Sequence, residues 1–176
     1  LLAFSSENLM WLIENILEFE SDLSQMKSTS QTLDVKEELE TICSNFQQLF
    51  DDKGVDFIVQ VQIGESSRIA SIDRLHQVTF SLLDSAFKLT QEGFVKFDVE
   101  EHGGSINLNL ECSNPEIPAG FLKRVFNRFY LTSEENYKIL GGSGLNLYMI
   151  NRIAEHNNWS FETTQPPERL QFKLRL

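Results

Sequence analysis

The sequence of 176 residues has few cysteines, few basic residues and no long apolar run. Two cysteines, Cys43 and Cys112, are too few for a disulfide framework, so we expect both to be reduced, buried and inert. The sequence has only 15 Lys and Arg residues but 26 Asp and Glu residues, and the formal net charge of -11 argues against nucleic acid as a partner. No segment approaches the roughly 20 apolar residues of a membrane span. We therefore expect a cytoplasmic part of a longer protein, attached to a membrane only through that parent.

The first 27 residues carry an apolar heptad pattern. A repeat of seven residues favours a left-handed helix bundle or coiled coil. We interpret this segment, with a Ser- and Thr-rich connection, as a dimerisation helix and linker over residues 1–30, although an ordinary core helix has the same pattern. The residues of the predicted dimer contact are Leu2, Leu9, Leu12, Ile16, Phe19, Leu23 and Met26.

Residues 31–176 alternate between helical and strand-like periodicity. Asp34 is a predicted N-cap, and Gly54 is the predicted end of the helix that follows it. The remaining pattern predicts strands at 55–63, 69–72, 94–101, 105–112, 159–163 and 170–176, and helices at 74–90 (capped by Asp73), 118–130 and 145–158. This order predicts an α/β (α+β) two-layer sandwich, in which helices cover one face of a mixed, mostly antiparallel sheet.

Two stretches could bind an anion. Gly141, Gly142 and Gly144 lead directly into a helix, whose free amides are an anion site. In the helix at 74–90, Ser81, Ser85 and Lys88 share one face. Two hydroxyls and an ammonium there could hold a phosphate, although small polar residues on a helix usually only permit close packing.

Four segments together resemble the ATP-binding domain of sensor histidine kinases, which has the Bergerat-type fold shared with gyrase and Hsp90-like ATPases. RLHQVTFSLLDSAFKLT (74–90) resembles the N box, RVFNRFY (124–130) the F box, and GGSGLNLYMINRIAEHNN (141–158) the second glycine box. ENLMWLIENILEFESDL (7–23) resembles the second helix of the dimerisation domain that precedes the ATP-binding domain in hybrid kinases. The resemblance implies a histidine-kinase-like ATP-binding domain over residues 31–176.

The same resemblance assigns nucleotide-site positions, and several of them carry unusual residues. Ser85 replaces the N-box asparagine that coordinates magnesium in the family. Ser81 replaces the N-box asparagine one helical turn upstream. Cys112 replaces the aspartate that accepts a hydrogen bond from adenine. Glycines of the two glycine boxes are replaced by Asn114, Glu116 and Asn146. The positions that match the family's phosphate site are Lys88, Gly141, Gly142, Ser143 and Gly144.

These departures predict a pseudo-histidine-kinase domain with no catalytic residue, no metal and no cofactor. It would act through a sensor kinase, a receiver domain or a phosphotransfer domain, and a homodimer is a further expected assembly. One alternative is an active kinase domain that binds ATP and magnesium, with Asp84 as an unusual metal ligand, and phosphorylates a histidine outside this chain. Another is a sensor of a different small molecule in the same cavity.

Overall fold

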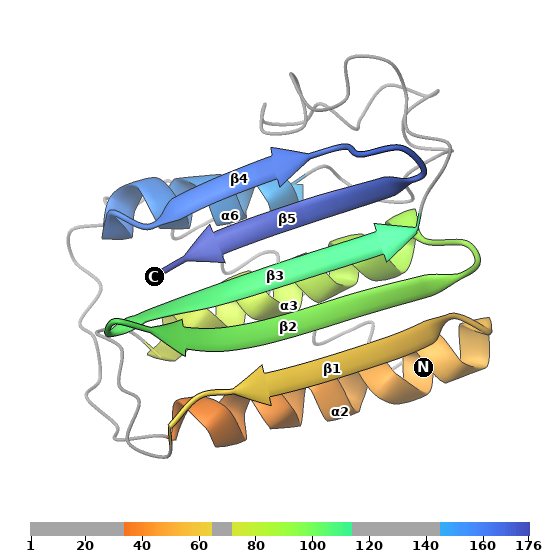
Figure 1. Cartoon of the computed structure of the whole chain (residues 1–176), viewed down its shortest axis with the longest axis horizontal. Coiled ribbons are helices and arrows are strands. Elements are labelled where there is room, and N and C mark those ends of the chain that lie inside the picture. The colour runs from red at the N-terminus through yellow and green to blue at the C-terminus, as the bar shows by residue number, and fades with distance from the viewer. Residues whose placement is uncertain (1–33, 65–71, 114–144) are drawn as a thin grey trace. The chain divides into compact units, whose positions relative to one another are not determined.

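The structure is a computed structural model, and it describes residues 34–64, 72–113 and 145–176. Five strands form one sheet in the order β1-β2-β3-β5-β4. Helices α2, α3 and α6 lie together behind one face of this sheet (Figure 1). In chain order the elements are α2 (Val35–Lys53), β1 (Asp56–Gln62), α3 (Ile72–Leu89), β2 (Phe94–His102), β3 (Ser105–Ser113), α6 (Leu145–Asn157), β4 (Ser160–Thr164) and β5 (Arg169–Arg175).

Helix α2 begins and ends at the residues that the sequence predicts. The Asp34 side chain accepts a hydrogen bond of 2.8 Å from the backbone N–H of Lys36, which satisfies one free amide of the first turn. Gly54 takes a φ of 74°, and its own N–H donates to the last turn. The apolar stripe between these ends is buried. The N-cap, the apolar stripe and the C-cap glycine therefore all predict the same helix, which explains why it could be predicted from the sequence.

The sheet is mixed because only β1 and β2 run parallel, whereas the β2–β3, β3–β5 and β5–β4 pairs are antiparallel. Gly103 and Gly104 form the β2–β3 turn with positive φ. The strands alternate, so that most apolar residues face the helices and most polar residues face away, although Ile58 of β1 is 44% exposed. The inward residues of β2, β3 and β5 are fully or almost fully buried: Val95, Phe97, Val99, Ile106, Leu108, Leu110, Cys112, Leu170, Phe172 and Leu174.

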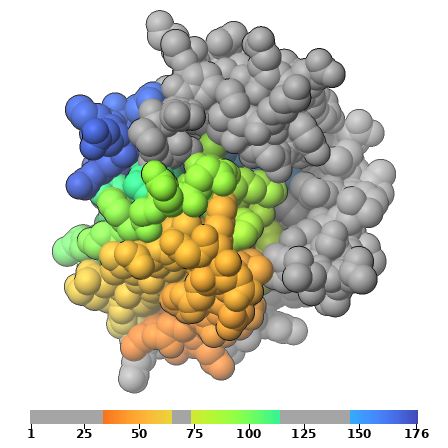
Figure 2. All heavy atoms as spheres, turned by 90° about the vertical axis from the view of Figure 1, so that its right-hand side faces the viewer, coloured from red at the N-terminus to blue at the C-terminus, as the bar shows by residue number. Residues whose placement is uncertain are grey.

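Aromatic side chains join α2 to β1 and α3. The Phe50 ring stacks on Phe57 at 4.6 Å between centroids and meets Phe87 edge-on at 5.4 Å. The Lys53 ammonium donates to the Phe87 carbonyl, and burial lowers the pKa of Lys53. In Figure 2, the orange to yellow atoms of α2 and β1 lie directly against the green atoms of the chain that follows β1. These contacts fix α3, which carries the candidate site.

One predicted boundary is wrong. A strand was expected at 69–72 with Asp73 as a helix cap, but α3 already begins at Ile72 and Asp73 lies inside it. The β-branched Ile72 favours a strand when it is read by itself, whereas the amphipathic period of α3 extends over it. An acidic residue in the first turn also suits the helix dipole, so Asp73 is as compatible with that position as with a cap.

Several predictions lie outside the described residues. These are the dimerisation helix and linker at 1–30, residues 69–71 of the short strand, the helix at 118–130 and the glycine run at 141–144. Within the described part of the chain, no helix is long and apolar enough to cross a membrane.

Candidate functional site

Helix α3 holds the two serines of the candidate site, and both are buried. Ser81 and Ser85 expose only 1% and 7% of their surface. The Ser85 hydroxyl donates a hydrogen bond of 2.7 Å to the Ser81 backbone carbonyl, one turn earlier in the same helix. Such a bond back to the preceding turn satisfies the hydroxyl inside the helix. The side chain of Ser85 is therefore committed to its own backbone.

Lys88 and Asn146 meet on the carboxylate of Asp84. The Lys88 ammonium lies 2.5 Å from Asp84 Oδ2, one turn away on α3. The Asn146 side-chain amide, in the first turn of α6, donates to the same oxygen. The Asp84 side chain is only 13% exposed, whereas that of Lys88 is 36% exposed. The structure thus brings together one residue of each predicted phosphate-site segment, with Asp84 between them.

Sequence reasoning missed this Asp84–Asn146 contact. The Asp84–Lys88 half was readable, because residues four apart on a helix lie on one face. The half that involves Asn146 was not, since it joins positions 62 residues apart in the chain. An amide in place of a glycine was a signal that this position had acquired a polar contact.

Cys112 lies on the inner face of β3 and is fully buried. Its thiol donates to the Leu170 carbonyl of β5, with sulfur and oxygen 3.7 Å apart. Burial raises the pKa of Cys112 to about 11. The thiol also faces the hydroxyl of Thr90, which is itself completely buried. The predicted adenine position therefore holds a neutral thiol in apolar surroundings.

The other predicted site residues, Asn114, Glu116, Gly141, Gly142, Ser143 and Gly144, lie outside the described residues. Among the residues that the structure describes, no group of three or more His, Cys, Asp or Glu side chains could hold a metal ion.

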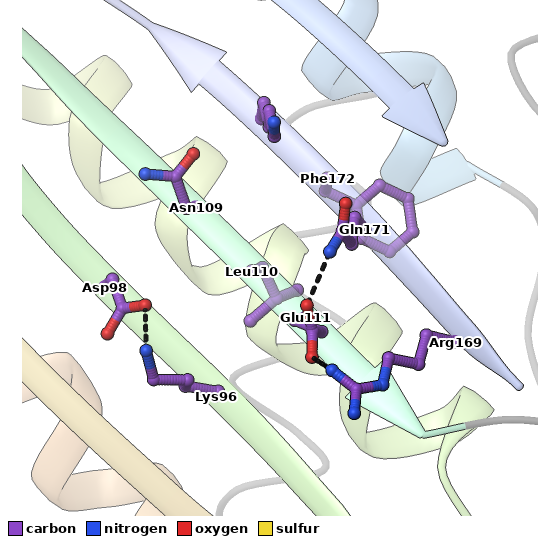
Figure 3. Close-up of a pocket in the computed structure, with 9 residues that line it drawn as sticks. Lys96, Asp98, Asn109, Leu110, Glu111, Arg169, Gln171 and Phe172 are labelled. Atoms are coloured by element: carbon purple, nitrogen blue, oxygen red, sulfur yellow. Dashed lines mark hydrogen bonds and ion pairs between the residues drawn. The ribbon is translucent and has the colours of Figure 1, made fainter. Parts of the chain in front are cut away.

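A separate depression of about 500 Å³ lies on the face of the sheet opposite α2, α3 and α6 (Figure 3). Five of its polar side chains form pairs within the lining. Lys96 binds Asp98 at 2.6 Å, and Glu111 accepts from both Arg169 and Gln171. Because four of its five charged side chains are paired, with Lys173 as the exception, we interpret the depression as a solvated face.

Comparison with known proteins agrees with this architecture. Residues 70–176 match the family model described as histidine kinase-, DNA gyrase B- and HSP90-like ATPase. The sensor protein CopS of Pseudomonas syringae pv. tomato is 31% identical over 99 residues, which cover 56% of this chain and 20% of CopS. The autoinducer 2 sensor kinase/phosphatase LuxQ of Vibrio cholerae is 26% identical over 161 residues, which cover 88% of this chain and 19% of LuxQ. The chain thus spans about one fifth of the length of these two relatives.

Solved structures show the same fold. The catalytic domain of the histidine kinase ThkA superposes with a TM-score of 0.68 at 21% identity, over 82% of this chain and 92% of that one. The predicted two-layer architecture and the predicted histidine-kinase resemblance are both confirmed. The family match covers more than half of the chain and includes α3, the β2–β3 hairpin and α6. The chain therefore belongs to the histidine kinase-, DNA gyrase B- and HSP90-like ATPase family, in the form found in two-component sensor proteins.

Proposed function

We propose that this chain is a pseudo-histidine-kinase domain, which regulates a two-component phosphorelay through protein contacts and binds ATP weakly or not at all. The observation that carries the proposal is the hydroxyl of Ser85. It stands where the family resemblance places a magnesium ligand, yet it donates its proton to the Ser81 carbonyl. The bond leaves the oxygen lone pairs free, but it holds the hydroxyl against the preceding turn of α3, where Ser85 is only 7% exposed. A serine hydroxyl is also shorter than an asparagine side chain and a poorer magnesium ligand than an amide carbonyl.

The position assigned to adenine recognition supports the same proposal. A carboxylate there would accept a hydrogen bond from the adenine amino group, whereas Cys112 offers a weakly hydrogen-bonding thiol that already donates to Leu170. Loss of one charge-assisted acceptor costs roughly 1.5–3 kcal/mol. Together with the lost metal ligand, this is enough to turn micromolar binding, about 8 kcal/mol, into millimolar binding. The described residues therefore fit a magnesium nucleotide poorly.

Calorimetric titration with ADP and with AMPPNP, each with and without magnesium, tests the proposal. We expect no saturable heat below about millimolar nucleotide. A matched variant, Ser85→Asn with Cys112→Asp, returns the two family residues and is expected to gain affinity if the rest of the cavity is intact. Micromolar, magnesium-dependent binding by the unmodified chain would contradict the proposal.

An active kinase is the second candidate, and the persistence of Lys88 in a chain of this family favours it. It requires phosphate transfer from ATP to a histidine outside these 176 residues, so the assay uses the full-length parent protein. Under this alternative, Lys88→Ala and Asp84→Ala would each abolish the phosphohistidine signal. A signal that survives both substitutions, or its absence in the unmodified parent, argues against it.

In the relatives, this type of domain is one part of a longer sensor protein. We propose the same setting here, in the cytoplasm, with a sensor kinase, a receiver domain or a phosphotransfer domain as the partner. A third role, recognition of a different small molecule, would appear as a ligand-dependent rise in melting temperature in a metabolite screen.

A further inference from the structure

The Asp84 carboxylate is the point where the first turn of α6 joins α3 by hydrogen bonding. Lys88 and Asn146 both donate to one of its oxygens, Oδ2. Two donors on a single carboxylate oxygen form a small network, and its charge-assisted bonds are stronger than bonds between neutral groups. A side chain that is 13% exposed loses little of this strength to solvent.

The location of Asn146 gives this network a second source of stability. Helix α6 begins at Leu145, so the hydrogen bond from Asn146 places the Asp84 carboxylate near the amino end of this helix. Negative charge is favoured there by the helix dipole. No acidic residue of α6 itself lies in its first turn, so Asp84 supplies this charge from α3.

We propose that Asp84 is an internal clamp, which holds the start of α6 on α3 without any ligand and keeps Lys88 engaged within the protein. Asp84 occupies one of the three ammonium protons of Lys88 and its negative charge repels a phosphate, so it weakens any phosphate contact of that ammonium. The second statement rests on the proposed function, because only the family resemblance makes Lys88 a phosphate contact. The first statement stands on the described contacts alone.

A double-mutant cycle on the protein without nucleotide tests the clamp itself. Asp84→Ala and Asn146→Ala are expected to lower the melting temperature by about 2–4 °C each, and the double variant is expected to lower it little further. Residues that act through one contact show this lack of additivity. If the two shifts add, or if neither variant melts earlier, the clamp is wrong, whatever nucleotide binding turns out to be.

Titration with inorganic pyrophosphate tests the effect of Asp84 on Lys88. Asp84→Asn removes the negative charge and nearly keeps the side-chain shape, so we expect at least about tenfold tighter binding than in the unmodified chain. Asp98→Asn is the matched control, because Asp98 forms a similar pair with Lys96 on the face of the sheet opposite α2, α3 and α6. Equal affinities in the unmodified chain and Asp84→Asn, or an equal gain in the control, overturn this part.

The two experiments separate failure of the clamp from failure of the proposed function. Micromolar ATP binding by the unmodified chain removes the pseudokinase proposal, yet a non-additive cycle would still establish the Asp84–Asn146 contact. An additive cycle rules out the clamp. It does not affect the pseudokinase proposal, which rests on Ser85 and Cys112.

Discussion

At alkaline pH, both buried thiols of the chain lower the free energy of unfolding. Burial raises the pKa of Cys43 to about 12 and that of Cys112 to about 11, from an ordinary value of 9.0. The folded state therefore keeps both thiols protonated at a pH where the unfolded chain releases the protons. The stability from this difference is fully present below pH 9.0 and is lost as the pH rises through 11 to 12.

We expect this loss to be measurable by urea unfolding between pH 8 and pH 10. At pH 10 each thiol accounts for about 1.4 kcal/mol of lost unfolding free energy. The comparison protein is the double variant Cys43→Ala and Cys112→Ala, in which the pH-dependent part should shrink by about twice that amount. The difference between the two proteins removes the contribution of the lysines, including Lys53. Parallel pH profiles would show that the thiols ionise normally in the folded protein.

A second residue-scale prediction concerns the family aspartate that Cys112 replaces. Cys112→Asp places a carboxyl group at a position with no exposed surface, beside the Leu170 carbonyl. The Thr90 hydroxyl faces this position and can donate one hydrogen bond to the carboxyl group, but burial still raises the pKa of that group, and we expect a cost of about 3 kcal/mol of unfolding free energy. Cys112→Ala, which only deletes the sulfur, is expected to cost about 1 kcal/mol. Equal losses in the two variants would mean that Thr90, alone or with water, satisfies the new carboxyl group.

At the scale of elements, the entry into β2 depends on a glycine. Gly93 has a φ of 89°, and a Cβ built there would lie 2.4 Å from the Ser113 hydroxyl oxygen. That hydroxyl cannot yield easily, because it donates to the Glu92 carbonyl and accepts from the N–H of Phe94. The β2–β3 pairing at this end therefore leaves no room for a side chain.

Gly93→Ala is expected to lower the unfolding free energy by about 2–4 kcal/mol, from backbone strain and the clash together. The matched control is Gly54→Ala, since Gly54 also has a positive φ (74°) but open space at the Cβ position. The control should lose only the strain, about 1–2 kcal/mol. Chemical denaturation of the two variants measures the difference, and equal losses would mean that Ser113 moves aside freely.

The elements also show what sequence reasoning can reach. The α2 helix and the β2–β3 hairpin were predictable because cap, period and turn are local signals, and each agreed with the others. The start of α3 was not, because a β-branched residue and an acidic residue at its first positions fit either a strand with a cap or a helix. In the candidate site, helical spacing indicated the shared face of Ser81, Ser85 and Lys88, whereas Cys112 and Asn146 were found only through the resemblance to the family. Their actual partners, such as Asn146 for Asp84, are set by how α6 packs on α3, which no local pattern records.

At the scale of the whole molecule, strong acidity and a long apolar stripe oppose each other. A net charge of -11 makes two copies repel at low ionic strength. The heptad pattern in the first 27 residues predicts attraction, because an amphipathic helix of this length needs a partner for its apolar side. Added salt screens the repulsion and leaves the apolar contact in place. Self-association of this chain should therefore strengthen, rather than weaken, as salt is raised.

Light scattering after size exclusion checks this last prediction. We expect the mass of a dimer at moderate salt, and a dissociation constant that falls as sodium chloride rises from about 0.05 to 0.5 M, where the screening length shrinks severalfold. Ile16→Glu with Phe19→Glu places charges within the predicted stripe and should give a monomer under all these conditions. Asn15→Glu adds charge to the same segment outside the stripe and should still dimerise. A dimer that survives the stripe variant would place the contact elsewhere, whereas one that weakens with salt would make charge pairing, rather than apolar burial, its cause.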